Sequence, residues 1–359
     1  MNSMMVAKTV RCRVINLTKS KLNALNEEWS NFQDFIELEK RDLDWIADKI
    51  PIRSVYKCQA RWISKRIKHK FAMSLSNQVM QVKKTDNKLS KCWIKVPVKS
   101  KWGGIWLPVE PHCEFPDDYK IGESKIIKKT KGNKEWFEIY VVVKKEVQMK
   151  SCSNIITVDI GEKVMATVLF NGRPIFMGTK IRGIRRHYSW LRKRLGNKKL
   201  LKKVKQVGHK EQNKVNQILQ DISNEIAVLA TKTDSVIVIG DLKDIRKSAK
   251  KKGKRFNRIV NNMPHLKLTQ LIEHKASWSG IPVIRMNEHG TSKTCSRCSE
   301  IGIRKNQGLF ICKNCGYQVN ADYNATKNMY NRSMKHVFVD GVVLQPKSCL
   351  EQQAQEVLI

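Results

Sequence analysis

The chain has 359 residues and a mass of 41.6 kDa, which favours two or three domains over one small module. Its 69 Lys and Arg against 32 Asp and Glu give a formal net charge of +37, which disfavours an ordinary metabolic enzyme and indicates a polyanionic partner. The sequence contains no run of about 18 apolar residues and no visible secretory signal, so we expect neither a membrane-spanning nor an exported protein.

The first predicted elements are a strand and a helical region. Residues 8–14, KTVRCRV, alternate charged and apolar side chains, which predicts a strand with one face in water. Residues 20–79 have a helical pattern that Pro51 interrupts. Five apolar side chains in its first half recur at the spacing of one helix face: Leu22, Leu25, Trp29, Phe32 and Phe35.

Between residues 91 and 147 the pattern changes to short apolar stretches separated by Gly, Pro and Asp. Segments such as WIKVPV, GIWLPV and WFEIYVVVKKEV predict a small antiparallel β unit, which we interpret as a barrel. Trp93, Trp102 and Trp106 are expected in the core of this barrel, and a platform for RNA is their alternative role.

From residue 154 onward the sequence predicts strands that alternate with helices. Three strands come first, in IITVDIG, VMATVLFNG and RPIFMG. Residues 185–205 predict one strongly basic helix, and residues 215–229 an amphipathic one. The strand SVIVIGDL, the helix MPHLKLTQLIEHKASW and the strand PVIRMN complete a pattern typical of an α/β fold.

The ten cysteines indicate a metal site rather than a disulfide framework. Four of them form two CxxC pairs separated by thirteen residues, and the other six are scattered singly, which is typical of reduced thiols. Two such pairs at the ends of a short hairpin predict a closed tetrahedral Zn2+ site with a structural role. The predicted zinc ligands are Cys295, Cys298, Cys312 and Cys315.

Four acidic residues stand out in a chain this basic. Asp159 ends an apolar run before a Gly turn, where a lone buried carboxylate is costly and a ligand for a divalent cation fits. Asp241 and Glu288 follow two later strands, and Asp322 begins a helix in NADYNATKNM, where capping that helix is its structural alternative. A nuclease needs such a cluster, because two Mg2+ ions about 4 Å apart clamp the scissile phosphate.

Two segments of dense positive charge, residues 182–205 and 243–258, predict contacts with phosphates. The structural alternative is a solvated helix, although cations with so few acidic neighbours repel one another. Tyr188, Trp190 and Phe256 lie among them, either as core anchors or as platforms for bases. The predicted nucleic-acid-binding residues are Arg185, Arg186, Arg192, Lys193, Arg194, Lys202, Lys203, Lys254 and Arg255.

The segments TVDIGEK, VIVIGDL, TSKTCSRC and CKNCGYQVNADYNATKNM resemble the TnpB proteins of bacterial and archaeal insertion sequences. These proteins are RNA-guided DNA endonucleases related to type V CRISPR effectors and to Fanzor proteins. The resemblance covers about residues 154–330, while the N-terminal half agrees in layout only. It implies a nuclease domain with catalytic Mg2+, in which Asp159 matches the first catalytic Asp and Asp322 the third.

The fold class that follows is a multidomain α+β protein. It has a small β-barrel with a helical insertion, and then an RNase H-like (RuvC) α/β domain with an inserted four-cysteine zinc ribbon. The expected ranges are 1–17 and 91–150 for the wedge-like barrel, 18–90 for the helical recognition insert, 151–290 and 320–332 for the nuclease domain, 291–319 for the ribbon and 333–359 for a C-terminal tail.

One position departs from the family pattern. Many members have a Glu in the segment I-V-x-E-D-L, and Gly240 stands at that place here. One outcome is an inactive nuclease. The other, which we prefer, is that Glu288 supplies the carboxylate from a neighbouring strand. Asp241 is the other candidate, with a capping role in the following loop as its alternative.

The resemblance implies an RNA-guided, Mg2+-dependent DNA endonuclease encoded by an insertion sequence. The alternative is a nuclease-inactive RNA-guided DNA-binding repressor. A DNA-joining transposase is a weaker hypothesis, because no Tyr or Ser recombinase motif is present. The implied partners are a guide RNA from the end of the element and double-stranded target DNA, with no membrane, and the protein is expected as a monomer on one RNA in a prokaryotic cytoplasm, associated with the nucleoid.

Overall fold

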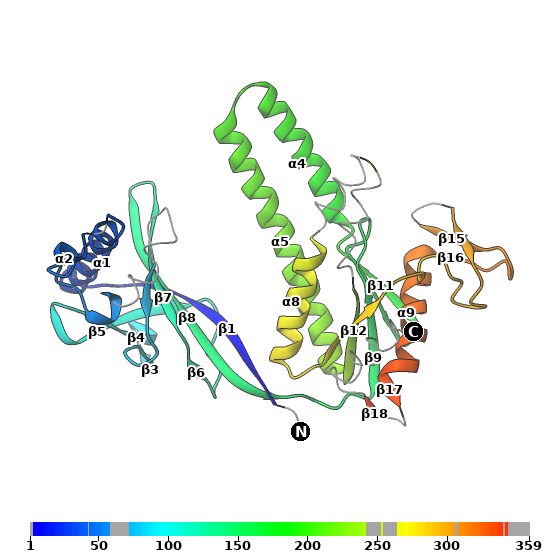
Figure 1. The fold of residues 1–359 in the computed structure, drawn as a ribbon, viewed down its shortest axis with the longest axis horizontal. Coiled ribbons are helices and arrows are strands. Elements are labelled where there is room, and N and C mark those ends of the chain that lie inside the picture. The colour runs from blue at the N-terminus through cyan, green and yellow to red at the C-terminus, as the bar shows by residue number, and fades with distance from the viewer. Residues whose placement is uncertain are drawn as a thin grey trace. The chain divides into compact units, whose positions relative to one another are not determined.

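The computed structural model describes residues 3–41, 43–57, 72–241, 253, 264–305, 308–339 and 342–343. The chain divides into two compact units: residues 5–146 form the N-terminal unit, and residues 147–359 with residues 1–4 form the C-terminal unit. Both are mixtures of helices and strands (Figure 1). No helix of the described part has the length and apolar character required to cross a membrane.

The N-terminal unit is built on an eight-stranded sheet with the order β2-β7-β8-β1-β5-β4-β3, and β6 pairs with β8. Side chains of β4 alternate between the buried and the more accessible face, as expected for strands with one face on a core. The strands are β1 (Ser3–Val14), β2 (Met73–Leu75), β3 (Gln81–Asn87), β4 (Ser90–Val98), β5 (Lys101–Pro111), β6 (Lys120–Ile121), β7 (Ser124–Lys131) and β8 (Lys134–Gln148).

Helix α1 (Lys19–Glu39) belongs to the same unit, and α2 (Asp44–Ala47) follows it. The side chain of Thr18 caps α1 by accepting a hydrogen bond from Lys21 N–H. The predicted apolar face is buried at Leu25, Trp29, Phe32 and Phe35, whereas Leu22 is 39% exposed. The helical pattern predicted as far as residue 79 is wrong at its end, because Met73–Leu75 pairs with β7 as an edge strand. Most of the second predicted helix, residues 58–71, lies outside the described residues.

The C-terminal unit contains a five-stranded sheet with the order β11-β10-β9-β12-β13. Strand β10 is antiparallel to β9 and β11, and β12 is parallel to β9 and β13. The strands are β9 (Asn154–Asp159), β10 (Ala166–Phe170), β11 (Arg173–Met177), β12 (Ser235–Asp241) and β13 (Val283–Asn287).

Helices cover both faces of this sheet, which explains why β9 and β12 are almost continuously apolar. Figure 1 shows the sheet between α8 (His265–Trp278) and α9 (Ala321–Val337). Side chains of α5 (Leu201–Lys232) and α8, among them Leu219, Ile226 and Ile272, pack in one core with Ile156 and Val238 of the strands. The sheet is therefore a rigid platform for the residues at its strand ends.

The single basic helix predicted over residues 185–205 is wrong in its last part. Helix α4 (Lys180–Asn197) ends before it, and the chain turns at residues 198–200 into α5, so the two form a hairpin. Lys199 has φ +56°, a left-handed conformation that reverses the chain. The short strands β14 (Gly302–Arg304), β15 (Leu309–Cys312) and β16 (Gln318–Asn320) form a small separate sheet, and β17 (Phe338–Val339) pairs with β18 (Val342–Val343).

Candidate functional site

Three acidic residues gather where the parallel strands end. Asp159 is the last residue of β9 and Asp241 the last of β12. Ile239 pairs with Val158, so the next residues, Gly240 and Asp159, stand side by side. Asp241 pairs with Asn287 at the end of β13, and Glu288 follows directly. The carboxyl ends of parallel strands lie at one sheet edge, which is the usual place for a site in such folds.

Asp322 reaches the same place from the other side of the sheet, on the first turn of α9. The capping role considered for it is wrong, because the side chain of Asn320 caps the helix by accepting from the N–H groups of Asp322 and Tyr323 at 2.9 and 3.1 Å. Thr157 Oγ1 of β9 donates to the carbonyl of Thr326, which fixes the helix on the strand. The Asp322 carboxylate is therefore available for other contacts.

The pKa shifts show that the four carboxyl groups interact electrostatically. Burial raises the pKa of Asp159 to about 7, and the charge of Asp322 adds to the effect while Arg304 opposes it. Burial also raises the pKa of Glu288 to about 8, with further contributions from Asp159 and Asp241. The structure thus brings together the acids that were predicted from separate parts of the sequence.

Gly240 and Glu288 fit each other closely. A Cβ atom placed on Gly240 would lie 1.3 Å from Glu288 Oε1 and 2.1 Å from its Cδ. The Glu288 carboxyl group therefore occupies the space where any side chain of residue 240 would begin. Glu288 Oε1 is buried and has no hydrogen-bond partner among the residues that the structure describes. An unpaired buried oxygen is costly unless a cation or water satisfies it.

Arg304 supplies positive charge to the site and was not predicted from the sequence. It ends β14, and its Nη2 donates to Asp322 Oδ1 at 2.7 Å across eighteen positions of the chain. The Asp322 side chain is 13% exposed, so water screens the pair only in part. No local pattern marks Arg304, because the contact exists only once the small sheet is folded against α9.

Asp241 has a different environment from the other acids. It is close enough to Arg285 for its charge to raise the pKa of that guanidinium, after the larger effect of the hydrogen bonds that Arg285 donates to Glu273. Arg285 is held by both oxygens of Glu273, at 2.6 and 2.8 Å. Asp241 therefore lies beside a cation of the sheet as well as beside Glu288.

The residue types of the acidic cluster suit a hard divalent cation, whereas among the described residues only the four cysteines have their ligand atoms close enough together to hold one ion. Asp159, Asp322 and Glu288 offer only carboxylate oxygens, which are the ligands that Mg2+ prefers. Glu288 Oε1 is buried without a hydrogen-bond partner among the described residues, so a cation bound there would satisfy it. The chemistry of these residues and the Gly240 space are both consistent with a magnesium site.

The four predicted zinc ligands meet at one point. The Sγ atoms of Cys295, Cys298, Cys312 and Cys315 all lie within 4.8 Å of one another, which confirms the predicted cluster. Two of the pairs are separated by 3.8 and 3.5 Å, close to the spacing of about 3.8 Å for sulfurs bound tetrahedrally at about 2.3 Å from zinc. The Cys315 N–H bond to Cys312 Sγ is the main cause that lowers the pKa of Cys312, whereas burial and the hydrogen bonds with the other three thiols raise the pKa of Cys315. The cluster could bind zinc.

Asparagines of α9 tie this cysteine cluster to the acidic site. Asn324 Oδ1 accepts from Ser296 N–H at 3.0 Å, and its Nδ2 donates to Thr294 O at 2.7 Å. Asn328 Nδ2 donates to the same carbonyl and to Thr291 O. Both asparagines are buried and four residues apart, so they lie on one helix face. The repeated Asn of NADYNATKNM thus fixes the first CxxC loop on the helix that carries Asp322.

Most of the predicted nucleic-acid-binding residues lie on the α4–α5 hairpin. Arg192 forms an ion pair with Glu211, and Arg185 is half-buried with its pKa lowered by burial, so neither is an open contact. Lys254 and Arg255 lie outside the described residues. The remaining five are exposed: Arg186, Lys193, Arg194, Lys202 and Lys203.

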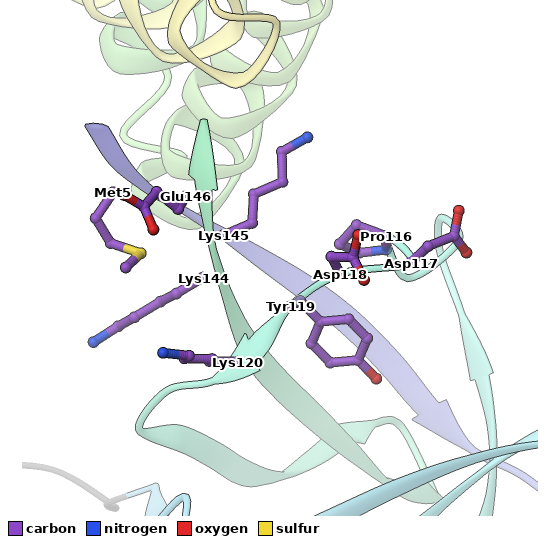
Figure 2. Close-up of a pocket in the computed structure, with 9 residues that line it drawn as sticks. All are labelled: Met5, Pro116, Asp117, Asp118, Tyr119, Lys120, Lys144, Lys145 and Glu146. Carbon is purple, nitrogen blue, oxygen red and sulfur yellow. The ribbon is translucent and has the colours of Figure 1, made fainter. Parts of the chain in front are cut away.

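A separate hollow of about 560 Å3 lies in the N-terminal unit (Figure 2). Lys120 and Lys144 stand opposite each other in paired strands, and Figure 2 shows their amino groups on the same side. Acidic and basic groups alternate around it, so no single charge dominates and we place the candidate site at the sheet edge instead. Its walls are Met5, Pro116, Asp117, Asp118, Tyr119, Lys120, Lys144, Lys145 and Glu146.

Known proteins resemble this chain in sequence and fold. A family model described as Cas12f1-like, TNB domain, matches residues 265–329. TnpB-like protein MJ0751 of Methanocaldococcus jannaschii is 33% identical over 228 residues, which are 60% of this chain and 79% of that protein. The CRISPR-associated endodeoxyribonuclease Cas12f1 of Sulfoacidibacillus thermotolerans is 28% identical over 245 residues, but this chain covers only 56% of it.

A cryo-EM structure of a Cas12f1-sgRNA-target DNA complex contains a chain that is similar with a TM-score of 0.60 at 14% identity. The likeness covers 92% of this chain and 99% of that one. At this identity it shows the fold alone. The mixed α+β, multidomain architecture predicted from the sequence is confirmed as a Cas12f-like fold.

The asparagine clamp predicts a link between α9 and zinc retention. Asn324→Ala leaves buried partners at Ser296 and Thr294 unsatisfied, and we expect a loss of about 2–3 kcal/mol of unfolding free energy with faster zinc release. Urea unfolding and a chromophoric zinc chelator measure the two effects. Asn314→Ala, which changes an exposed residue of the second CxxC loop, is the control. Unchanged zinc release in Asn324→Ala would contradict the clamp.

The acidic cluster predicts how stability depends on pH when Mg2+ is absent. Folding raises the pKa of Asp159 from 3.8 to about 7 and of Glu288 from 4.5 to about 8. The folded protein therefore binds more protons between about pH 4 and pH 8, and its stability falls as the pH rises through this interval. Glu288→Gln removes one charge, so the melting temperature at pH 8 should rise by about 2–4 °C for each kcal/mol relieved.

Differential scanning fluorimetry with zinc retained measures this change, and the exposed Glu300→Gln is its control. A lower melting temperature for Glu288→Gln at pH 8 would show that the carboxylates do not repel one another in the folded protein.

Proposed function

This chain belongs to the family of TnpB-like proteins, and from that premise we propose that it is an RNA-guided, Mg2+-dependent DNA endonuclease encoded by an insertion sequence. The observation that carries the proposal is the Glu288 carboxyl group in the space above Gly240. The buried Glu288 Oε1, which has no hydrogen-bond partner among the described residues, costs free energy in the folded state, and a role in metal binding would explain why the chain keeps it.

We assign the C-terminal unit to the RNase H-like (RuvC) class. The strand order of its sheet supports this class: in β11-β10-β9-β12-β13 strand β10 is antiparallel to β11 and β9, and β9, β12 and β13 are parallel. The domain ranges predicted from the sequence, the barrel included, are part of the proposal, with β2 and β3 of the predicted insert of residues 18–90 now belonging to the eight-stranded sheet. A structural zinc ion in the ribbon of residues 291–319 also belongs to the proposal.

In the proposed site Asp159, Asp322 and Glu288 hold the metal ions. Bound there, Mg2+ would activate a water molecule and stabilise the leaving oxygen, so that hydrolysis yields a 5′-phosphate and a 3′-hydroxyl. The protein's own contribution is positioning: β9 and β13 fix two carboxylates, and α9 fixes the third through Asn320 and Thr157. Arg304 offsets part of the negative charge of Asp322.

The proposed partners are a guide RNA from the end of the element and double-stranded target DNA. The exposed cations of the α4–α5 hairpin would contact phosphates and release counterions, while base pairing with the guide supplies the sequence specificity. We propose a monomer on one RNA, in a prokaryotic cytoplasm and associated with the nucleoid.

The Gly240–Glu288 fit predicts an unusual sensitivity to the smallest possible substitution. Gly240→Ala places a methyl group on the Glu288 carboxyl and should reduce plasmid cleavage at least 100-fold, as should Glu288→Gln. Gly208→Ala is the matched control, because nothing lies within 4 Å of the added carbon, and it should keep wild-type activity. The assay is cleavage of a matched supercoiled plasmid by the protein with its RNA and Mg2+.

The carboxylate can also be moved to the other strand. The double variant Gly240→Glu with Glu288→Gly restores a carboxylate on β12, and we expect it to regain cleavage above either single variant. Asp241→Asn should retain activity, and its complete loss alongside an active Glu288→Gln would assign the role to Asp241 instead. A wild-type protein that shifts the plasmid in gels but leaves it supercoiled would establish the repressor.

A further inference from the structure

Trp102 is exposed to an unusual degree. The side chain is 92% accessible, more than any other large apolar side chain of the described residues. A tryptophan is highly buried on average, so this exposure loses the free energy that burial would provide. Trp102 was expected in a barrel core, and the structure shows that this prediction is wrong.

The backbone that presents Trp102 is fixed. It lies at the turn between β4 and β5, where Val98 pairs with Lys101. Gly103 and Gly104 follow with φ +79° and +82°, and a Cβ on Gly104 would meet the Val96 carbonyl oxygen at 2.5 Å. Both glycines therefore stand where other residue types would be strained, in the irregular part of β5 that follows Trp102.

Arg53 contacts the Trp102 ring and supports it. Its guanidinium carbon lies 5.6 Å from the centre of the Trp102 ring, a cation–π contact. The same guanidinium donates from Nε to Val98 O at 2.8 Å and from Nη2 to Lys101 O at 2.7 Å, one bond on each side of the turn. Arg53 is thus a fixed support and not a mobile surface side chain.

Glu28 of α1 anchors this support in the core. It is 2% exposed, and its two oxygens accept from Arg53 N–H at 2.9 Å and Lys99 N–H at 2.6 Å. One buried carboxylate therefore ties the helix, the arginine and the turn together. An exposed aromatic ring with such a framework is pre-organised, which lowers the entropy lost on binding a flat partner.

The charge around the ring indicates which partner fits. Residues 90–105 contain four lysines and no acidic residue, and Lys99 and Lys101 flank the turn as exposed side chains. A flat aromatic surface among cations matches a base with its phosphates. In duplex DNA the bases are already stacked on one another, whereas loops and ends of RNA offer unpaired bases for aromatic side chains.

We propose that Trp102, supported by Arg53 and Glu28, is a stacking platform for an unpaired base of the RNA. The proposal rests on the proposed function for the identity of the partner, but it does not depend on cleavage. Trp102 contacts the base, and Arg53 and Glu28 are positioning residues. Two related exposed tryptophans, Trp45 beside Lys49 and Trp190 beside Arg194, lack the clamped turn.

The test measures binding of the full-length protein to a 20-nucleotide oligouridylate by fluorescence anisotropy. Trp102→Ala should weaken this binding about tenfold or more, and Trp102→Phe should keep most of it. The slope against salt concentration should not change, because no charge is removed. Leu89→Ala, which removes an exposed apolar side chain at the neighbouring β3–β4 turn, is the control and should bind as wild type.

Two further probes, one RNA and one DNA, test whether the loss of binding depends on an unpaired base. An abasic RNA of the same length should bind wild type and Trp102→Ala equally, and a 20-base-pair DNA duplex should also not distinguish them. Unchanged oligouridylate binding in Trp102→Ala, or an equal loss on duplex DNA, would overturn the proposal. A change in sedimentation that accompanies the substitution would instead assign the platform to a second copy of the chain.

The outcome is separable from that of the proposed function. Wild-type protein that fails to cleave plasmid, yet loses oligouridylate binding on Trp102→Ala, would refute the nuclease and support the platform. Cleavage that disappears in Gly240→Ala, with RNA binding unchanged by Trp102→Ala, would support the nuclease and refute the platform.

Discussion

The absence of one side chain at Gly240 is the constraint on which the candidate site depends. Acidic groups that share a partly dry space repel one another, and each also loses hydration, which is why the pKa values of Asp159 and Glu288 are raised. Such an arrangement is stable only when the surrounding structure holds it. The Gly240 space admits the Glu288 carboxyl to within reach of Asp159, and no other residue type leaves that space open.

The surrounding structure holds the acids through a chain of contacts that begins at the cysteine cluster. The first CxxC loop is bonded to Asn324 and Asn328 of α9, and the same helix presents Asp322 two residues before Asn324. Arg304 of the small sheet then reaches Asp322 directly. Metal binding by the cysteines would therefore stabilise the position of an acid that is not itself a zinc ligand, as outer contacts do in other metal sites.

Local patterns predicted the parts of the site that depend on local chemistry. The apolar run that ends at Asp159 and the CxxC spacing are visible in the sequence, and the family resemblance carried by the NADYNATKNM segment is confirmed by the relatives. The turn at residues 198–200 was missed because one basic helical pattern runs through it without Pro, although Gly196 and Asn197 stand before it. Strand β2 was missed because a three-residue segment with two apolar side chains, Met73 and Leu75, fits a helix equally well, and only its pairing with β7 decides.

Contacts between distant residues could not be predicted in the same way. No local pattern marked Arg304, and Trp102 was ambiguous, since an indole between strands has several ordinary roles. Glu288 and Asp241 remained alternatives for the same reason: both follow strands that end at one edge of the sheet. Glu288 and Asp241 differ in whether the side chain turns into the space above Gly240. That direction depends on how three adjacent strands pack together.

Moving a carboxylate from β12 to β13 changes the chain but need not change the site. Met286 is level with Gly240 in the parallel pair, and Glu288 lies two residues further along the chain, directly after the end of β13. A glutamate side chain is long enough to reach back from there to the neighbouring strand, provided that nothing stands between. A metal ion responds to the position of oxygen atoms and not to the strand that delivers them, so a glycine at the old position and a glutamate at the new one form a single requirement. Each is unfavourable without the other: the glycine alone leaves a cavity among charges, and the glutamate alone collides with a side chain.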